Sequence, residues 1–259
     1  MSASYVYGVF SDAGGGPFST PGVEQDVPPH LVTADGLAAI VSPVASAHVR
    51  ATRRNLRAHG DVLAEAVARG TVLPLRFGVV LAGDEAVHDE LLCRRGAELN
   101  RLLDAYEGTV EMAVRAVYDE EEVLRHVTAT SPSIVRLRDE ARRASGSARY
   151  YARIRLGEAV AAAVESWRAN VERKVLGRVR PTALDERLER ELPERVAVKA
   201  SFLVERERRG EFDDAVDDVA RELAPNVRFT SIGPLALHSF AALADVEPVA
   251  PMGGARWAS

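Results

Sequence analysis

Residues 60–80 read GDVLAEAVARGTVLPLRFGVV, a helical pattern that runs into an apolar, strand-like segment. Apolar side chains recur one helical turn apart in the first half, and Asp61 is of a type that caps helix N-termini. The second half is rich in the branched and apolar residues that favour strands. The pattern predicts a helical region over residues 45–69 with a break at residues 59–61, followed by a strand over residues 72–80.

Upstream, the sequence reads as strands separated by a loop. Residues 5–10 alternate and are rich in strand-favouring side chains, whereas residues 11–29 hold three consecutive glycines and several prolines. Residues 31–34 and 37–41 flank Asp35-Gly36, a pair that favours the tight turn of a β-hairpin. We therefore expect a strand, an irregular loop and a hairpin before the first helix.

Downstream, helical and strand patterns alternate. Asp84 is placed to cap a long helix, and residues 110–118 alternate as a strand does. Residues 120–176 are helical in pattern, with interruptions near Ser131-Pro132 and at residues 145–147.

The last part of the chain begins with a charged link. After residues 184–193 we expect a strand over residues 196–204 and a helix over residues 212–223. Two further strands, at residues 227–232 and 235–240, are expected around a Gly-Pro turn.

These elements predict an α+β protein with two domains, each a small, mainly antiparallel, ferredoxin-like sheet with packed helices, joined by a helical region. The predicted boundaries are an N-terminal α+β domain over residues 1–118 and the helical region over residues 119–180. A C-terminal α+β unit that packs with the helical region follows over residues 181–244, and residues 245–259 form a flexible tail.

Composition excludes several classes of protein. The formal charge of −5 gives no sustained positive field, which argues against a nucleic-acid partner bound through phosphates. No run approaches the roughly 18–20 apolar residues of a membrane span, so no lipid membrane is expected as a partner. The single cysteine, Cys93, fits a reducing compartment, and a cytoplasmic location is expected.

Three segments carry a resemblance to a known family. They are LPLRFG at residues 73–78, the strand and helix expected over residues 195–223, and the closing SIGPLALHSF at residues 231–240. In this order they resemble the gas vesicle synthesis F/L family, and the likeness extends from Tyr5 to Phe240. Members commonly carry a Trp-Pro-Pro-Tyr-type cluster after the last Gly-Pro, where this chain has LALH at residues 235–238.

The resemblance implies a non-enzymatic accessory or minor structural protein of gas vesicle assembly, found at the gas vesicle or in the cytoplasm. Its implied partner is the apolar major shell protein, which it would bind and keep from aggregating prematurely during nucleation. Other gas vesicle accessory proteins are further partners that the family suggests. Any contact that the missing aromatic cluster makes elsewhere in the family would be made differently here, or not at all.

Five residues are candidates for partner contact. A cation inside an apolar run must face solvent, a carboxylate or a partner, and the resemblance places Arg76 and Phe77 on a partner-facing surface. Leu235, Leu237 and Phe240 are the others, at a sheet edge that would accept an apolar segment by strand addition. The plain alternative is an outward-pointing arginine and three residues of the core.

The sequence predicts no catalytic, cofactor-binding or metal-binding residue. No Gly-Lys-Ser/Thr follows the glycines at residues 14–16, and the six histidines show no His-x-x-x-His spacing. His88, Asp89 and Glu90 are expected to diverge by about 100° per residue on a helix. Cys93 lacks the signature of a cysteine enzyme.

One alternative class of function stays open. A small-ligand-binding regulatory module or enzyme on a ferredoxin-like fold would need a pocket with converging polar groups, near Arg76, Arg115 or His238. RNA binding through a sheet ranks last, because the aromatic pair on a basic strand that stacking requires is missing.

Overall fold

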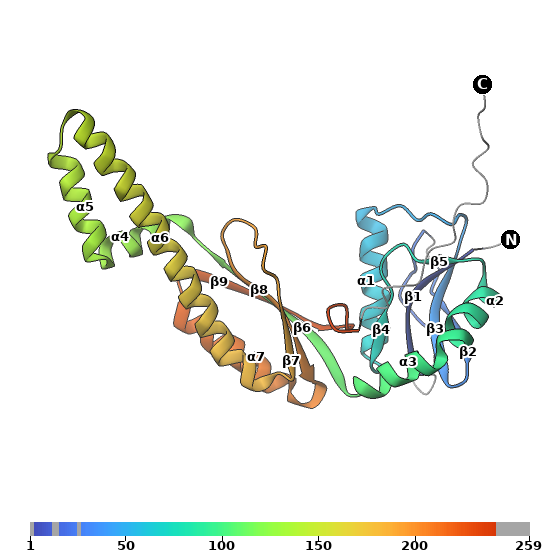
Figure 1. Cartoon of the computed structure of the whole chain (residues 1–259). Helices are drawn as coiled ribbons and strands as arrows, with labels where there is room; N and C mark the ends of the chain where they lie inside the picture. The colour runs from blue at the N-terminus through green and yellow to red at the C-terminus, as the bar shows by residue number, and fades with distance from the viewer. Residues whose placement is uncertain (1–2, 12–15, 25–26, 242–259) are drawn as a thin grey trace, which may run out of the picture. The chain divides into compact units, whose positions relative to one another are not determined.

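The computed structural model describes residues 3–11, 16–24 and 27–241, which form an α+β protein with two antiparallel sheets (Figure 1). The predicted fold class is confirmed. The chain divides into two compact units. Unit 1 comprises Met1–Met112, Glu205–Glu207 and Gly233–Ser259, and unit 2 comprises Ala113–Val204 and Arg208–Ile232. The predicted domain boundaries stay a prediction, and the predicted tail at residues 245–259 lies outside the described residues.

The sheet of unit 1 has the order β2-β3-β1-β4, with β5 also paired to β1. Its strands are β1 (Ala3–Ser11), β2 (His30–Ala34), β3 (Leu37–Val44), β4 (Val72–Pro74) and β5 (Val80–Leu81). The central strand, β1, is buried over nearly its whole length, and its partner β3 runs antiparallel from Leu37 to Val44. Asp35 and Gly36 both have positive φ, 49° and 79°, which is the conformation of the predicted hairpin turn.

Helix α1 (Arg53–Val67) is continuous, so the predicted break at residues 59–61 is wrong. Thr52 caps it, because its hydroxyl accepts a hydrogen bond from the Asn55 N–H at 3.2 Å. His59 lies on the buried face of this helix together with Val62 and Leu63. Gly60 is exposed, and one exposed glycine costs a helix only about 1 kcal/mol, which tertiary packing overcomes.

The prediction of one strand over residues 72–80 is wrong for the middle residues. Strand β4 ends at Pro74 and β5 begins at Val80. The Leu75 N–H still donates to the Tyr7 carbonyl at 2.9 Å, and the Val79 carbonyl accepts from the Val6 N–H at 3.0 Å. Residues 76–78 therefore leave the sheet as a turn between two anchored points.

The long helix expected from Asp84 is present but not uniform. It consists of α2 (Asp84–Ala86), the π-helix η2 (Val87–Cys93) and α3 (Arg94–Ala105). A π turn is wider than an α turn, and the spacing of apolar residues does not reveal it.

The second sheet has the order β7-β8-β6-β9. Its strands are β6 (Thr109–Tyr118), β7 (Asp185–Leu188), β8 (Val196–Glu205) and β9 (Val227–Leu235). The expected strands over residues 110–118 and 196–204 are confirmed, whereas β7 was expected to be a link. Strand β9 continues through Gly233 and Pro234, and no strand follows it among the described residues, so the prediction of a strand over residues 235–240 is wrong.

The helices of the second half are α4 (Glu120–Thr130), α5 (Pro132–Arg143), α6 (Gly146–Val179) and α7 (Arg209–Leu223), with short 3₁₀ turns η3 (Arg180–Thr182) and η4 (Arg206–Arg208). The two predicted interruptions are the ends of α4 and α5. Helix α6 packs against α7 in its C-terminal part and against α4 and α5 nearer its N-terminus (Figure 1). Val171 and Val175 of α6 are buried, and the Trp167 ring packs edge-on against the Tyr118 ring, with the ring centroids 5.4 Å apart.

Candidate partner-contact site

Arg76 and Phe77 lie on the turn between β4 and β5. The Arg76 side chain is exposed and the Phe77 side chain is half-buried. The Phe77 ring lies 5.8 Å from the ring of Tyr5 and 5.7 Å from that of His59. The Gly78 N–H donates to Tyr5 Oη at 3.3 Å, and the φ of Gly78 is +96°, which only glycine adopts readily. The contacts of Phe77 and Gly78 with buried side chains thus fix the turn, while the Arg76 side chain lies at the surface.

A buried polar cluster lies under this turn. Tyr5 Oη is 2.8 Å from His59 Nδ1, and Tyr7 Oη is 2.9 Å from Ser42 Oγ. Tyr7 also accepts a hydrogen bond from the Val23 N–H at 2.8 Å, and its ring stacks on His59 at 5.6 Å. The alternation of residues 5–10 predicts that Tyr5 and Tyr7 lie on the same face of a strand. The burial of His59 was not predicted, because its position was assigned to a helix break.

Burial fixes the protonation of the cluster. It raises the pKa of both tyrosines and, with a smaller contribution from His238, lowers the pKa of His59 to about 4. At neutral pH the histidine is therefore uncharged. Because Tyr5 Oη accepts from Gly78, its own proton is available to His59 Nδ1, which leaves the imidazole proton on Nε2.

The segment after β9 is held by side chains of unit 1. The buried carboxylate of Glu111 accepts hydrogen bonds from the Ser239 N–H and hydroxyl, and the Tyr106 hydroxyl donates to the Phe240 carbonyl at 3.2 Å. Leu237 is buried, while Leu235 and Phe240 are half-buried. Leu235 is the last residue of the edge strand β9, so strand addition at Leu235 stays a prediction. Residues 236–241 form a turn, so the expectation of a strand at Leu237 and Phe240 is wrong.

Phe77 and the segment after β9 both lie near His59. Phe77 contacts the His59 ring, and His238, within the segment after β9, is near enough to influence its pKa. The structure therefore brings Arg76 and Phe77 to the same part of unit 1 as the segment after β9, which holds Leu237 and Phe240 and follows directly on Leu235. A contact of these residues with a partner stays a prediction.

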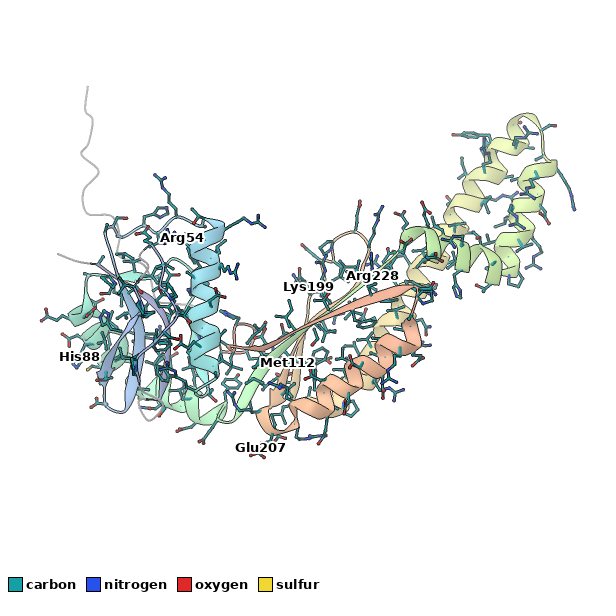
Figure 2. The ribbon with its side chains drawn as sticks, turned by 180° about the vertical axis from the view of Figure 1, so that it is seen from behind. Arg54, His88, Met112, Lys199, Glu207 and Arg228 are labelled. Atoms are coloured by element: carbon teal, nitrogen blue, oxygen red, sulfur yellow. The ribbon has the colours of Figure 1, made fainter. Side chains whose placement is uncertain are left out.

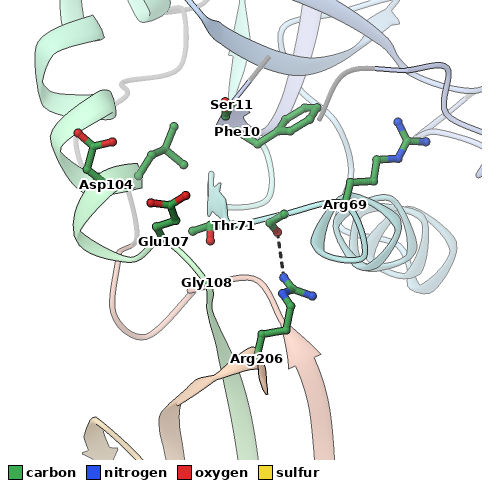
Figure 3. Close-up of a pocket in the computed structure, with 10 residues that line it drawn as sticks. Phe10, Ser11, Arg69, Thr71, Asp104, Glu107, Gly108 and Arg206 are labelled. Carbon is green, nitrogen blue, oxygen red and sulfur yellow. Dashed lines mark hydrogen bonds between the residues drawn. The ribbon is translucent and has the colours of Figure 1, made fainter. Parts of the chain in front are cut away.

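A pocket of about 460 Å³ lies elsewhere in unit 1 (Figure 3). It is lined by Phe10, Ser11, Arg69, Gly70, Thr71, Leu103, Asp104, Glu107, Gly108 and Arg206. Arg206 donates to the Val67 carbonyl at 2.9 Å and to the Gly70 carbonyl at 3.2 Å. Arg69 donates to two backbone carbonyls and to Glu65 at 2.6 Å. Both guanidinium groups thus already donate hydrogen bonds to oxygens of the protein, which weakens the case for a ligand site here.

His88, Asp89 and Cys93 form an exposed group on η2, and Figure 2 shows His88 at the surface of unit 1. His88 Nδ1 lies 2.7 Å from Asp89 Oδ1 and 3.7 Å from Cys93 Sγ. The expectation that His88 and Asp89 diverge is wrong, and the π turn brings residues five apart close together. All three side chains are open to water, and Glu90 is not in the group.

Ser4, Asp84 and His30 also lie together, but not as a catalytic triad. Ser4 Oγ donates to Asp84 Oδ1 at 2.5 Å, and His30 Nε2 lies 2.7 Å from Asp84 Oδ2. Burial raises the pKa of Asp84, but the hydrogen bonds from Ser4 and His30 outweigh it and lower the pKa overall. Because the carboxylate stands between serine and histidine, the imidazole does not reach the serine proton.

Comparison with known proteins finds relatives along nearly the whole chain. Residues 3–242 match the family described as gas vesicle synthesis protein GvpL/GvpF. Gas vesicle protein F of Streptomyces sp. (strain CB03234) is 38% identical over 240 residues, covering 92% of this chain and 99% of that protein. Gas vesicle protein F of Nostoc sp. (strain PCC 7120) is 26% identical over 246 residues, covering 93% and 98%.

Two crystal structures share the fold. That of GvpF from Anabaena sp. PCC7120 has a TM-score of 0.80 at 24% identity and covers 94% of this chain and 99% of that one. That of GvpF from Microcystis aeruginosa has a TM-score of 0.72 at 22% identity and covers 93% and 99%. Among the described residues, no helix combines the length and apolarity needed to cross a bilayer.

Proposed function

The chain belongs to the GvpL/GvpF family of gas vesicle synthesis proteins, and we propose that it binds the apolar major shell protein and prevents its premature aggregation during nucleation. It acts where gas vesicles assemble, as an accessory or minor structural protein, and catalyses no reaction. Gas vesicle proteins are the partners that family membership implies.

The physical need for such a protein follows from the shell subunit itself. A subunit that is apolar enough to build a gas-filled shell exposes large apolar patches before it is incorporated, and such patches aggregate in water. A partner that covers these patches reversibly keeps the subunit available for growth.

The anchored turn that carries Arg76 is the observation on which the proposal rests. Gly78 is bonded to Tyr5, and Phe77 packs on Tyr5 and His59, so the turn is ordered before any partner arrives. A preordered surface loses less conformational entropy on binding than a flexible one. The segment after β9, fixed by Glu111, adds a second ordered stretch of backbone in unit 1.

The competing idea of a small-ligand module has less support. The guanidinium groups of Arg69 and Arg206 beside the 460 Å³ pocket already bind protein oxygens. None of Arg76, Arg115 and His238, the residues first considered for such a site, lines this pocket.

Co-purification with the co-expressed major shell protein tests the proposal. The tagged wild-type chain is compared with Arg76→Glu and with Arg53→Glu, a matched reversal of another exposed arginine in unit 1. A carboxylate at position 53 lies in the first turn of α1, where the helix dipole favours it, so folding is preserved. We expect wild type and Arg53→Glu to retain the shell protein, and Arg76→Glu to retain about tenfold less.

Other outcomes are equally informative. If wild type retains no more shell protein than an unrelated acidic protein does, the proposed function is wrong. If Arg76→Glu retains as much as wild type, the function stands but the contact lies elsewhere. Equal losses in both variants would indicate an effect of net charge alone. Circular dichroism of each variant confirms that it is folded.

A further inference from the structure

Arginine is concentrated at one end of a helical hairpin in unit 2. Helices α5 and α6 pack side by side, and residues 136–155, where α5 ends and α6 begins, are called the hairpin end here (Figure 1). This stretch holds seven arginines and two carboxylates, a formal charge of +5, in a chain whose total charge is −5. The charge is therefore strongly segregated.

Each of the two carboxylates of the hairpin end lies close to an arginine of the same stretch. Asp139 lies 4.0 Å from Arg138, and Glu140 forms an ion pair with Arg155. Within the described part of the chain, five arginines at this end have no carboxylate at ion-pair distance, namely Arg136, Arg142, Arg143, Arg149 and Arg153. Like charges held close together repel, so an anionic partner is favoured at this place.

Apolar side chains are exposed beside these arginines. Tyr150 and Tyr151 are each 65% exposed and Ile154 is 41% exposed, although large apolar residues in the rest of unit 2 are mostly buried. The two tyrosine rings lie 5.7 Å apart and edge to face.

The exposed apolar residues continue along one face of α6. Tyr150, Ile154, Gly157 and Ala161 are all exposed and recur at steps of four, three and four, which places them on one side of a helix. Ala152, which projects from another side of α6, is buried. Apart from the adjacent residues and backbone of α6 itself, no described atom lies within 4 Å of the position that a Cβ on Gly157 would take, so a second backbone can approach closely there.

We propose that the hairpin end and this face of α6 bind an acidic amphipathic helix of a protein partner. The partner's apolar stripe covers Tyr150, Ile154 and the small residues beyond them. Its flanking carboxylates meet the arginines that have no carboxylate of their own. Arg136 and Arg143 also line a hollow on α5, together with Asp139 and Glu140.

The chemistry of the surface favours a helix over other anions. A nucleic acid supplies phosphates but no apolar stripe, and the chain as a whole is negatively charged. An anionic bilayer would meet the turn between α5 and α6 but not the side of α6 as far as Ala161. A helix with carboxylates beside an apolar stripe matches both features, and helix-in-groove recognition uses the same spacing.

Peptide binding to the full-length protein tests the inference. The probe is a fluorescent amphipathic peptide of glutamate and leucine at helical spacing, and its control has glutamine in place of glutamate. The test variant carries Arg142→Glu, Arg149→Glu and Arg153→Glu. The matched variant carries Arg173→Glu, Arg190→Glu and Arg228→Glu, three exposed arginines elsewhere in unit 2.

We expect the glutamate peptide to bind wild type and the matched variant equally, and to bind the test variant at least about tenfold more weakly. The glutamine peptide should also bind about tenfold more weakly, and high salt should reduce the binding of the glutamate peptide. A second variant, Tyr150→Gln with Ile154→Gln, keeps every charge, and its weaker binding would show that the apolar stripe takes part.

Several results would overturn the inference. One is equal binding of both peptides, and another is an undiminished affinity of the folded test variant. Binding of single-stranded RNA or of phosphatidylglycerol vesicles that exceeds peptide binding and is lost in the test variant would assign the surface to another class of partner. Self-association lost in that variant would assign it to a second copy of the chain. Retention of the shell protein, measured separately with Arg76→Glu, tests the proposed function independently.

Discussion

The carboxylate of Glu111 accepts two hydrogen bonds from Ser239, one from its backbone N–H and one from its hydroxyl, each 2.7 Å long. The two residues are 128 positions apart, and Glu111 is only 3% exposed. A buried carboxylate is costly unless hydrogen bonds compensate it, and these two bonds do so while fixing the segment after β9. The position of Leu237 and Phe240 therefore depends on a residue in β6.

Glu111→Ala should lower the free energy of unfolding by roughly 2–4 kcal/mol, because it removes two charge-assisted hydrogen bonds and leaves the Ser239 donors without their acceptor. Urea denaturation measures the change. Ser239→Ala removes the hydroxyl bond to Glu111 but keeps the backbone one, and should cost roughly 1–2 kcal/mol. An unfolding midpoint for Glu111→Ala equal to that of wild type would show that the pair does not stabilise the fold.

The buried imidazole of His59 makes stability depend on pH. Burial is the main cause that lowers its pKa from 6.5 to about 4 in the folded protein, whereas the unfolded chain keeps the ordinary value. Between these two values the unfolded state binds more protons, so the stability that His59 contributes is complete above about pH 6.5 and is lost as the pH falls toward 4. The loss amounts to roughly 3 kcal/mol.

His59→Gln isolates this effect, because the carboxylates titrate alike in both proteins. The difference in unfolding free energy between wild type and variant should shrink by roughly 3 kcal/mol from neutral pH to about pH 4. Urea titrations at the two pH values measure it. A difference that does not change with pH would mean that the folded protein takes up the proton as easily as the unfolded chain does.

Gly22→Ala should destabilise the protein by roughly 1–3 kcal/mol through overpacking. A Cβ at position 22 would lie 2.7 Å from Tyr7 Oη and closer still to Ser42 Oγ. These two oxygens are hydrogen-bonded to each other in the buried cluster. Gly60→Ala is the control, since no described atom lies within 4 Å of its Cβ position and alanine favours the helix by about 1 kcal/mol. Thermal denaturation should therefore shift in opposite directions, and a shift in the same direction contradicts the account.

Local patterns were enough to predict most elements. Alternation located β1 and β6, Asp35-Gly36 located the hairpin turn, and the polar interruptions located the ends of α4 and α5. These features depend on residues close in sequence, and the α+β fold class follows from their order.

The missed features depend on contacts between residues far apart. The turn at residues 76–78 exists because β1 holds the chain on either side of it, and the turn after β9 exists because Glu111 and Tyr106 hold it. His59 was predicted at a helix break because Gly60 and Asp61 follow it, whereas the fold places its ring against Tyr5 and Tyr7. Tertiary packing overrides local propensity at each of these places.

Arg206 fastens the C-terminal end of α1, and this contact can be removed. Its guanidinium donates to the carbonyls of Val67 and Gly70, which have no partner within the helix. The dashed line in Figure 3 marks a hydrogen bond of Arg206. Arg206→Ala should lower the free energy of unfolding by roughly 1–3 kcal/mol, and Arg206→Lys should restore only part of it, because an ammonium group lacks the planar fork. Arg208→Ala is the control, since Arg208 forms an exposed ion pair with Glu211 and its loss should have little effect. Urea denaturation compares the three variants, and similar losses for Arg206→Ala and Arg208→Ala would show that the contact with α1 contributes nothing specific.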